Sequence, residues 1–178
     1  MPRADAVRNR QRVLSAARAA FAEEGPGVSL DDVARRAGVG AGTVHRHFPT
    51  KDALFAAVIA DRLAELAEVG AGLAGAPDPG LAFAGFFRRL AAEAAQNLAL
   101  SAALTDPGEV IMDAGRDLEA AIAVLLRRAQ ESGAVRADVT TAELHAIIAG
   151  AVVMEQRLPE ASKGRGLQVL VDGLRAGA

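Results

Sequence analysis

One stretch of 23 residues, Ser29 to Lys51, constrains the fold of this chain more than any other part of it. It reads SLDDVARRAGVGAGTVHRHFPTK. Leu30, Val33 and Ala34 recur at helical spacing and predict a short helix with one apolar face. Ser29 stands directly before them, where its hydroxyl can accept a hydrogen bond from a free backbone N–H group. The pattern therefore predicts both a first short helix and the residue at which it begins.

A second short helix is expected after a glycine. Gly38 predicts a left-handed or otherwise tight turn, because a residue with a Cβ atom resists that conformation. Beyond the turn, Val39, Val44 and Phe48 are spaced to pack back onto the first helix. The other positions divide between the flanks and the outer face: Ala41, Gly42, Thr43, His45, Arg46 and His47. Two short helices joined by a glycine-containing turn, the second small, polar and basic, predict a helix-turn-helix.

The composition favours a soluble, mostly helical protein. Hydrophobic residues make up 51% of the 178 residues, which is enough to bury a core and argues against disorder. The absence of cysteine excludes a disulfide framework, a thiolate zinc site and a cysteine nucleophile. No apolar stretch follows the basic N-terminus as a secretory signal requires, and the longest apolar run, Ala146–Met154, is too short to cross a bilayer. We therefore expect a cytoplasmic protein that does not associate with membranes.

Charge is distributed unevenly along the chain. Residues 1–51 carry nine Arg or Lys side chains against five acidic ones, a net charge of +4. Residues 52–178 carry eleven basic and seventeen acidic side chains, a net charge of −6. A basic segment attached to an acidic one is typical of a phosphate-binding module fused to a different domain. Chance clustering on solvated helix faces is the alternative explanation.

The rest of the chain predicts helices and no strand, which gives an all-α fold of about nine helices. The clearest loop is expected at Gly70–Gly80, and Thr50 can cap the helix that follows the helix-turn-helix. We expect a helix-turn-helix DNA-binding head, residues 1–50, and a larger regulatory bundle, residues 51–178. Besides the two short helices, the predicted ranges are Ala6–Glu24, Lys51–Leu73, Leu81–Leu98, Ala99–Thr105, Asp113–Glu131, Thr141–Arg157 and Gly166–Leu174.

The last two predicted helices favour a dimer. Apolar residues cover most of the circumference of the first, so we expect it to be buried nearly all round. Small residues on it would let another helix approach closely, and the two helices together could form a four-helix interface with a second copy. The alternative is that both helices simply complete the core of one chain. The candidate interface residues are Ile147, Gly150, Ala151, Leu167, Leu170, Val171 and Leu174.

No motif in the chain requires an enzyme, a metal or a cofactor. His45 and His47 stand two residues apart on one helix and therefore point in roughly opposite directions, so they cannot readily share a metal ion. His145 lies in an apolar helix, where a hydrogen-bonded core or interface residue is more common than a metal ligand. No serine lies in a GxSxG sequence, and the GVGAGT run follows a helix where a dinucleotide-binding loop would follow a strand.

The second short helix has the chemistry that DNA recognition needs. Ala41 and Gly42 are small enough for the helix to approach base edges closely, and Thr43 can donate to a phosphate. Arg46 can bind guanine with two hydrogen bonds, or contact a phosphate instead. Lys51 begins the next helix, whose free N–H groups already favour an anion. An ordinary exposed side chain is the alternative for any one of these residues, but their concentration on one short segment favours double-stranded DNA as the partner.

From Ser29 to Leu54 the chain resembles the DNA-binding domain of the TetR (AcrR) family of bacterial transcriptional regulators. The family pattern has a capping Ser or Thr, a Val/Ile-Ala pair, then G-V-S-x-G-T-L-Y-x-H-F and K-x-x-L. The chain matches it at Ser29, Val33-Ala34, Gly38-Val39, Gly42-Thr43-Val44, His47-Phe48, Lys51 and Leu54. The resemblance implies backbone contacts from Thr43, His47 and Lys51, with Arg46, Ala41 and Gly42 closer to the bases.

Two positions depart from the pattern. Gly40 stands where the family often has Ser, which removes a helix cap and a possible phosphate contact. His45 stands where Tyr is usual, and its charge depends on pH. The predicted DNA-binding set is Ser29, Ala41, Gly42, Thr43, His45, Arg46, His47 and Lys51.

The resemblance also implies the way such a protein works. A homodimer would bind a palindromic operator, and a small-molecule effector in the C-terminal bundle, which loosely resembles the SbtR-like domains, would release it. The candidate ligand-lining residues are Phe83, Phe86, Phe87, Leu90, Met112 and Met154, although core packing is the more common role for such side chains. Two other classes stay open: a sequestering protein whose head no longer reads an operator, and an enzyme with an unrecognised site.

Overall fold

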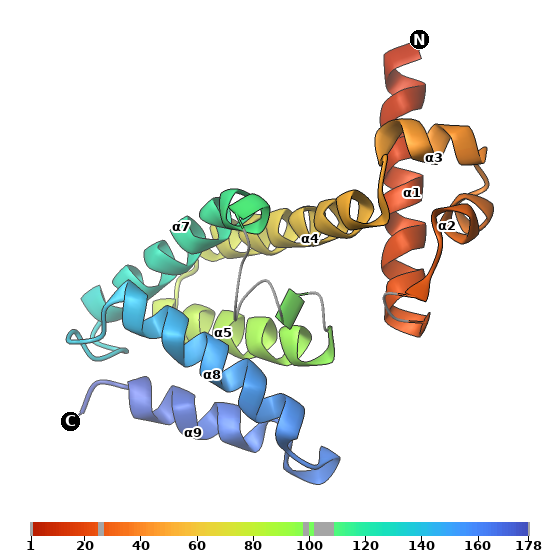
Figure 1. The fold of residues 1–178 in the computed structure, drawn as a ribbon. Coiled ribbons are helices and arrows are strands. Elements are labelled where there is room, and N and C mark those ends of the chain that lie inside the picture. The colour runs from red at the N-terminus through yellow and green to blue at the C-terminus, as the bar shows by residue number, and fades with distance from the viewer. Residues whose placement is uncertain (1, 25–26, 98–99, 102–108, 178) are drawn as a thin grey trace. The chain divides into compact units, whose positions relative to one another are not determined.

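The computed structural model describes residues 2–24, 27–97, 100–101 and 109–177, with the backbone alone for residues 2–4 and 109–114. In this part of the chain the fold is all-helical, as predicted, with eight α-helices, one short 3-10 helix and no named strand (Figure 1). Within it, no helix is long and apolar enough to span a membrane. The helices are α1 (Pro2–Glu24), α2 (Leu30–Ala37), α3 (Ala41–His47), α4 (Lys51–Leu73), α5 (Pro79–Gln96), α7 (Glu109–Glu131), α8 (Thr141–Arg157) and α9 (Arg165–Leu174), with the 3-10 helix at Glu160–Ser162.

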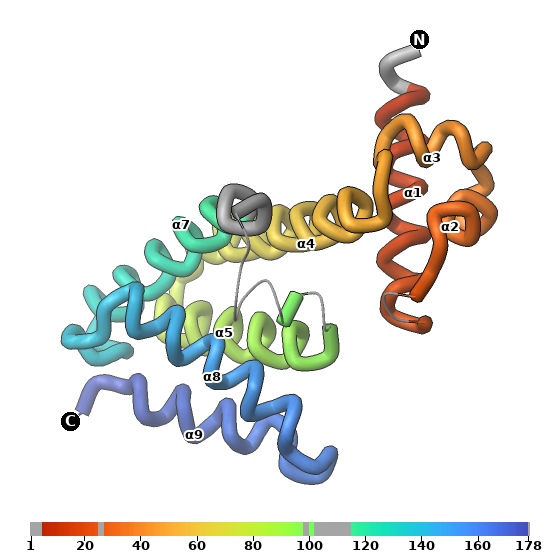
Figure 2. Tube along the Cα trace, viewed as in Figure 1, coloured from red at the N-terminus to blue at the C-terminus, as the bar shows by residue number. Residues whose placement is uncertain are grey.

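The chain divides into two compact units, Met1–Asp61 and Arg62–Ala178, and the division falls within α4. We call them the head and the body. In the head, α2 and α3 pack against α1 and against each other (Figure 2). Phe21 of α1 and Phe55 of α4 meet edge to face with their ring centroids 5.4 Å apart. Of the residues that helical spacing predicted for the motif, Val33, Ala34, Val44 and Phe48 are in the buried core of the head, whereas Leu30 and Val39 are only partly buried. The whole core consists of Val13, Leu14, Ala17, Ala20, Val28, Val33, Ala34, Ala37, Val44, Phe48, Leu54 and Val58.

The body is organised around α5. This helix packs against α7, α8 and α9, and Figure 1 shows α8 crossing α5 with α9 beside it. Its inner face carries Phe83, Phe86, Phe87 and Leu90, each at most 4% exposed. The large side chains on this face fill the space between α5 and the three helices that pack against it.

The predicted loop at Gly70–Gly80 is wrong at both ends. Helix α4 continues to Leu73 and α5 begins at Pro79, which leaves 74–78 as the connection. Gly70 lies in α4, where an added Cβ would sit 2.9 Å from the Cβ of Ala121 and 3.1 Å from Cζ of Phe86. Gly80 lies in α5, where an added Cβ would sit 2.5 Å from the Cβ of Ala134. Both glycines allow close packing between elements, and a glycine with that role looks like a loop residue in the sequence.

Other helix boundaries agree with the prediction to different degrees. The range Lys51–Leu73 and the range Thr141–Arg157 are reproduced to the residue. Thr50 caps α4, since the backbone N–H of Ala53 donates to its hydroxyl at 3.1 Å. Helix α1 begins four residues before the predicted Ala6, and α7 begins at Glu109 where Asp113 was predicted. The predicted helix Ala99–Thr105 lies mostly outside the described residues, of which 100 and 101 are helical.

Helix α8 is not buried all round within one chain. Its inner face includes Leu144, Ile148, Ala151 and Val152, all at most 3% exposed. The opposite face, with Ala146, Gly150 and Val153, is exposed. The apolar circumference predicted a buried helix, but a single chain covers only one side of it.

Candidate nucleic-acid interface

Ser29 fixes the start of α2 as predicted. Its hydroxyl accepts from the backbone N–H of Asp32 at 3.1 Å and donates to the Asp32 carboxylate at 2.6 Å. The hydrogen bond from Ser29 holds the pKa of Asp32 below its ordinary value, with Arg35 lowering it further. Two links between two residues therefore hold the first turn of α2 in place.

Gly38 forms the turn in the left-handed conformation that was predicted, with φ 62° and ψ 39°. Its carbonyl accepts from the guanidinium of Arg12 at 3.0 Å, so α1 also holds the turn. The N–H of Val39 donates to the carbonyl of Ala34 at 3.1 Å and completes the end of α2. The angle at which α3 leaves α2 is thus set by backbone and side-chain hydrogen bonds together.

Helix α3 is anchored by its apolar residues and exposes the rest. Val44 is 0% and Phe48 is 3% exposed, as their spacing predicted. Gly40 precedes the helix without any side-chain cap, which agrees with the loss expected from its replacing Ser. An added Cβ at Gly42 would meet nothing within 4 Å, so the packing of this chain does not require a glycine there. A small residue that the packing of the chain does not require would allow a partner molecule to approach the helix closely.

The structure places the predicted DNA-binding residues on and beside α3. Those with exposed side chains or backbone are Ser29, Ala41, Gly42, His45 and Arg46, and those that are half-buried are Thr43, His47 and Lys51. His45 approaches Asp31 of α2, with Nε2 3.7 Å from the carboxylate. His47 lies beside Phe48, with ring centroids 6.2 Å apart. The histidines therefore differ in surroundings as well as in direction.

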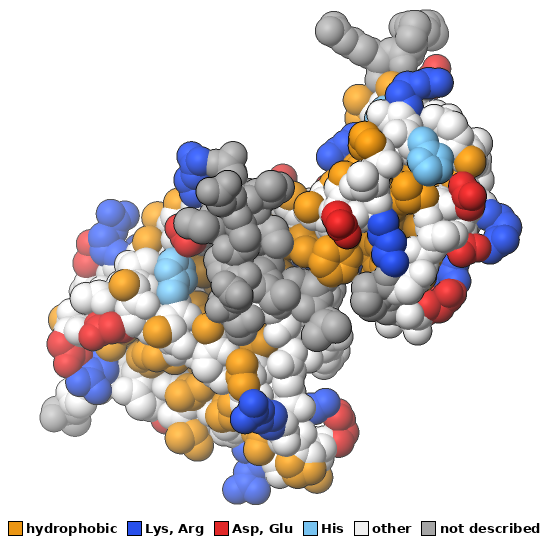
Figure 3. Space-filling model, viewed as in Figure 1, with side chains coloured by type: hydrophobic (Ala, Val, Ile, Leu, Met, Phe, Trp, Pro, Cys, Tyr) orange, Lys and Arg blue, Asp and Glu red, His pale blue; other side chains and the backbone are white. Residues whose placement is uncertain are grey.

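Ion pairs neutralise a large part of the positive charge of the head. Arg35 pairs with Asp32, and Arg36 pairs with both Glu23 and Glu24, which ties α2 to the end of α1. Arg8 pairs with Asp5, and Arg18 pairs with Asp61 at 2.8 Å. On the face shown in Figure 3, acidic and basic side chains interleave over the head. The number of Arg and Lys side chains alone therefore overstates how many cations are available to a phosphate.

Four cations of the head make no ion pair with any residue the structure describes: Arg10, Arg12, Arg46 and Lys51. Arg10 lies over the ring of Phe48, 5.6 Å from its centroid, and Arg12 reaches the turn at Gly38. Both therefore lie at the edges of α3 although they belong to α1. Sequence reasoning missed these two, because helical spacing does not tell which part of a long helix crosses the motif.

The predicted ligand-lining residues are packed in the body core. Phe83, Phe86, Phe87 and Leu90 surround a void of about 10 Å³, which is smaller than any organic ligand. Met154 is half-buried and packs on α9, where its Cε would sit 2.6 Å from a Cβ added at Gly166. The side chain of Met112 lies outside the described residues. A ligand at these side chains stays a prediction, and in this structure the described ones have a packing role.

The predicted dimer residues divide into two groups. Ala151, Leu167, Val171 and Leu174 are at most 4% exposed and belong to the core of one chain, so they are not available to a partner. They were misplaced because an apolar residue on a helix has the same period whether it faces its own core or another copy. Ile147, Gly150 and Leu170 keep accessible surface. Contact with a second copy stays a prediction for these three.

This fold and this site define a class: an all-helical, helix-turn-helix protein of the kind that regulates transcription. Residues 13–58 match the family described as bacterial regulatory proteins, tetR family, and residues 78–176 match the SbtR-like transcriptional regulator C-terminal domain. The chain belongs to the TetR family of bacterial transcriptional regulators, and the resemblance seen in its sequence is confirmed, including that of its C-terminal domain.

Solved structures agree over nearly the whole chain. A TetR transcription regulatory protein from Mycobacterium vanbaalenii is 42% identical, with a TM-score of 0.74 over 98% of this chain and 99% of that one. The TetR transcriptional regulator SCO0520 from Streptomyces coelicolor is 32% identical, with a TM-score of 0.75 over 95% and 99% of the two chains. Among curated proteins, the HTH-type transcriptional regulator SAB2452 of Staphylococcus aureus is 43% identical over 53 residues, which span 29% of this chain and 29% of that protein.

Proposed function

We propose that the chain is a cytoplasmic repressor that binds a palindromic operator as a homodimer and leaves it when a small molecule binds the body. One observation carries the DNA-binding part of the proposal. Helix α3 exposes Ala41, Gly42 and Arg46, while Val44 and Phe48 hold it onto the head from behind. An anchored short helix with a small, basic outer face suits the major groove, where an α-helix fits and base edges are distinct.

In this proposal the residues of the site have separate roles. Arg46 binds a guanine edge, and Ala41 and Gly42 let the helix backbone come close to neighbouring bases. Thr43, His47 and Lys51 contact phosphates, as does the cation of Arg10 at the edge of α3. Ser29 acts through the cap that sets the start of α2. Functionally, residues 1–50 read the DNA and residues 51–178 carry regulation and dimerisation.

The homodimer would form through the exposed faces of α8 and α9. Val153 is 36% and Val169 is 70% exposed, and both are large apolar side chains on the outer surface of the body. An added Cβ at Gly150 or Gly173 would meet nothing within 4 Å, so neither glycine serves the packing of a single chain. Small residues on exposed helix faces allow close helix approach, and a symmetric dimer would place two heads on two half-sites.

The proposal is tested by footprinting on the intergenic DNA beside the gene of this protein, over a salt titration. We expect two protected half-sites about one helical turn apart. Arg46→Ala should weaken operator binding by about 1–3 kcal/mol and relax the preference for one base pair. Arg127→Ala is the matched control, since Arg127 is exposed on α7 of the body and pairs with Glu131 at 3.8 Å.

Binding that falls steeply with salt and shows no footprint would reject the repressor and favour a protein that only sequesters a small molecule. Equal operator affinity for Arg46→Ala and the parent would reject α3 as the recognition helix. Turnover of a compound by the purified protein would instead favour the enzyme alternative.

A further inference from the structure

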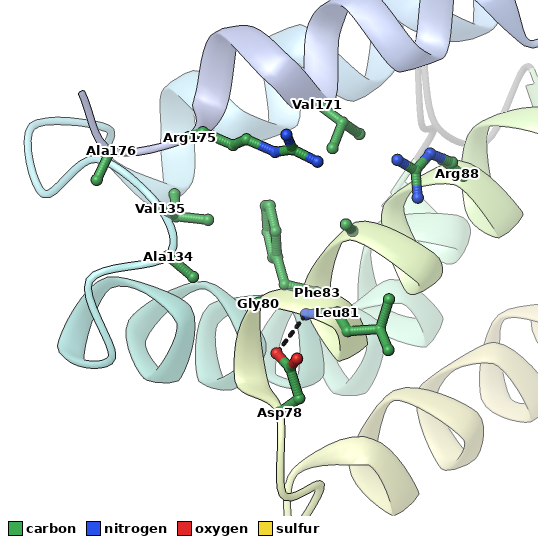
Figure 4. A pocket seen from close by; sticks show the side chains of 11 residues that line it. Asp78, Gly80, Leu81, Phe83, Arg88, Ala134, Val135, Val171, Arg175 and Ala176 are labelled. Carbon is green, nitrogen blue, oxygen red and sulfur yellow. Dashed lines mark hydrogen bonds between the residues drawn. The ribbon is translucent and has the colours of Figure 1, made fainter. Parts of the chain in front are cut away.

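The body has a hollow outside its core. Of the predicted ligand-lining residues whose side chains the structure describes, Phe83 alone is among those that line it. Its volume is about 430 Å³, within the range of small-molecule sites, and it lies between the start of α5, the α7–α8 connection and the end of α9. Figure 4 shows its lining side chains. The void inside the core has a volume of only about 10 Å³, so of these two spaces only the hollow has the volume of a small-molecule site.

One part of the hollow is apolar. Phe83 stands in it between α5 and α9, with Val135 and Val171 nearby (Figure 4). Leu81 lines the same hollow and is 69% exposed, so a large apolar side chain is left in water at its mouth. Phe83, Val135 and Val171 are at most 5% exposed and form the apolar wall, so the surface that the hydrocarbon part of a ligand would remove from water is mainly that of Leu81.

Two arginines face the hollow from opposite walls. In Figure 4 the guanidinium of Arg88, from α5, and that of Arg175, at the end of α9, point toward one another. A chain of contacts holds them: Arg88 donates to Gln168 Oε1 at 2.7 Å, Gln168 donates to Asp172 Oδ1 at 2.8 Å, and Arg175 lies 3.4 Å from the same Asp172 oxygen. The Asp172 carboxylate contacts only one of the two guanidinium groups, that of Arg175, while Arg88 donates to the neutral amide of Gln168, so this rim keeps a net positive charge.

The other charged group of the lining is Asp78. It lies at the start of α5, away from the arginines, and its Oδ1 accepts from the backbone N–H of Leu81 at 2.9 Å (Figure 4). Of the charged residues in the α7–α8 connection, Arg136 and Asp138 pair with each other at 2.6 Å. The hollow therefore has a positive end between the two arginines and an apolar floor beside it.

Hydrogen bonds to the α7–α8 connection hold the backbone from which the Arg175 side chain extends. Val135 and Arg175 form an antiparallel bridge, the N–H of Arg136 donates to the Leu174 carbonyl at 3.0 Å, and the N–H of Ala176 donates to the Ala134 carbonyl at 3.3 Å. A preformed site loses less entropy on binding than a loose one.

We propose that this hollow binds a small amphipathic carboxylate, with the carboxylate between Arg88 and Arg175 and the apolar part over Phe83, Val135 and Val171. Guanidinium groups match the geometry of a carboxylate and form its strongest hydrogen bonds. Assigning the bound acid the role of effector rests on the proposed function, but the binding site does not.

Calorimetric titration of the full chain with hexanoate, octanoate, decanoate and phenylacetate tests the site without DNA. At least one acid should bind with one site per chain, and its amine and alcohol of the same skeleton should bind at least about tenfold more weakly. Arg88→Gln and Arg175→Gln should each weaken the acid at least about tenfold, while Arg127→Gln should leave it unchanged. Leu81→Glu adds a negative charge at an exposed position of the lining and should also weaken binding of the acid at least about tenfold.

The site is overturned if none of the acids binds the folded protein, if the amine binds as tightly as the acid, or if both arginine variants bind the acid as the parent does. Circular dichroism of each variant shows that it is folded. Footprinting with and without the acid then separates the two proposals. Binding with an unchanged footprint removes the effector role and keeps the site, whereas a missing footprint without any acid counts against the repressor alone.

Discussion

The hydroxyl of Ser29 makes two of the hydrogen bonds on which the helix-turn-helix depends, one to the backbone and one to the carboxylate of Asp32. Removing it leaves the N–H of Asp32 without its cap. We expect Ser29→Ala to lower the free energy of unfolding of the head by about 1 kcal/mol, measured by urea denaturation. Ser15→Ala is the control, because Ser15 is exposed within α1 and should change stability by only about 0.5 kcal/mol or less. An equal effect of the two substitutions would contradict the importance of the cap.

Single residues also show which parts of the site a sequence can predict. The cap at Ser29, the left-handed turn at Gly38 and the buried position of Val44 depend on residues nearby in the sequence, so local sequence patterns predicted all three. Arg10 and Arg12 act on residues more than 25 positions away, and their approach to α3 depends on how α1 crosses it. No local pattern carries that information, and the pairing of Arg36 with Glu23 was equally out of reach.

At the scale of helices, glycine has two different roles, and the pair Gly70 and Gly85 separates them. An added Cβ at Gly70 would press on Ala121 and Phe86, so Gly70→Ala should destabilise the body by about 1–3 kcal/mol. Gly85 is exposed within α5 and nothing lies within 4 Å of an added Cβ, so Gly85→Ala should stabilise it by about 0.5–1 kcal/mol. Thermal unfolding of the two variants should move in opposite directions. A common sign would show that close approach of α4 to α5 and α7 does not require the glycine.

The capping box of α8 predicts a dependence on pH. The backbone N–H and the hydroxyl of Thr140 both donate to the carboxylate of Glu143 at 2.8 Å. The backbone bond first, and the hydroxyl second, lower the pKa of Glu143 below its ordinary value of 4.5. Because the pKa of Glu143 is lower in the folded state than in the unfolded state, its ionised form stabilises the fold at any pH above the unfolded-state pKa. This stabilisation is lost as the pH falls through the folded-state pKa. The stability difference between the parent and Glu143→Ala should therefore be largest at neutral pH and shrink in acid.

Glu143→Gln is the matched control, since glutamine keeps an acceptor for Thr140 but does not titrate. Its stability relative to Glu143→Ala should not follow the same acid profile. A constant difference between the parent and Glu143→Ala from neutral pH into acid would contradict the role of the charged form. The start of α8 was predicted to the residue from its apolar pattern, whereas the start of α5 was missed. Asp78 and Pro79 do mark that start, but the neighbouring glycines suggested a longer loop.

At the scale of the whole molecule, the structure explains why the sequence could suggest a dimer but could not identify the residues of the dimer interface. Apolar periodicity on α8 and α9 identified two helices with more hydrophobic surface than one chain can cover. It could not divide that surface, because Leu167 and Leu170 belong to the same apolar pattern and only the packing of α9 on α5 and α8 buries the first and leaves the second accessible. The accessible surface of α8 and α9 carries small and aliphatic residues, as do the interfaces of helix pairs that approach each other closely.

The dimer predicted for that surface can be tested without DNA. Val153→Glu places a charge on the outer face of α8, at a side chain 36% exposed in one chain, so it should leave the fold of the body intact and weaken association. Gly150→Leu should have the same effect by bulk, since a single chain has open space there. Val7→Glu, at a 63% exposed valine of α1, is the control and should sediment as the parent does. In sedimentation equilibrium at micromolar concentration the parent and Val7→Glu should be dimers and the two α8 variants monomers. A parent that is monomeric while giving a two-half-site footprint would reject this interface, because the pairing would then come from the DNA alone.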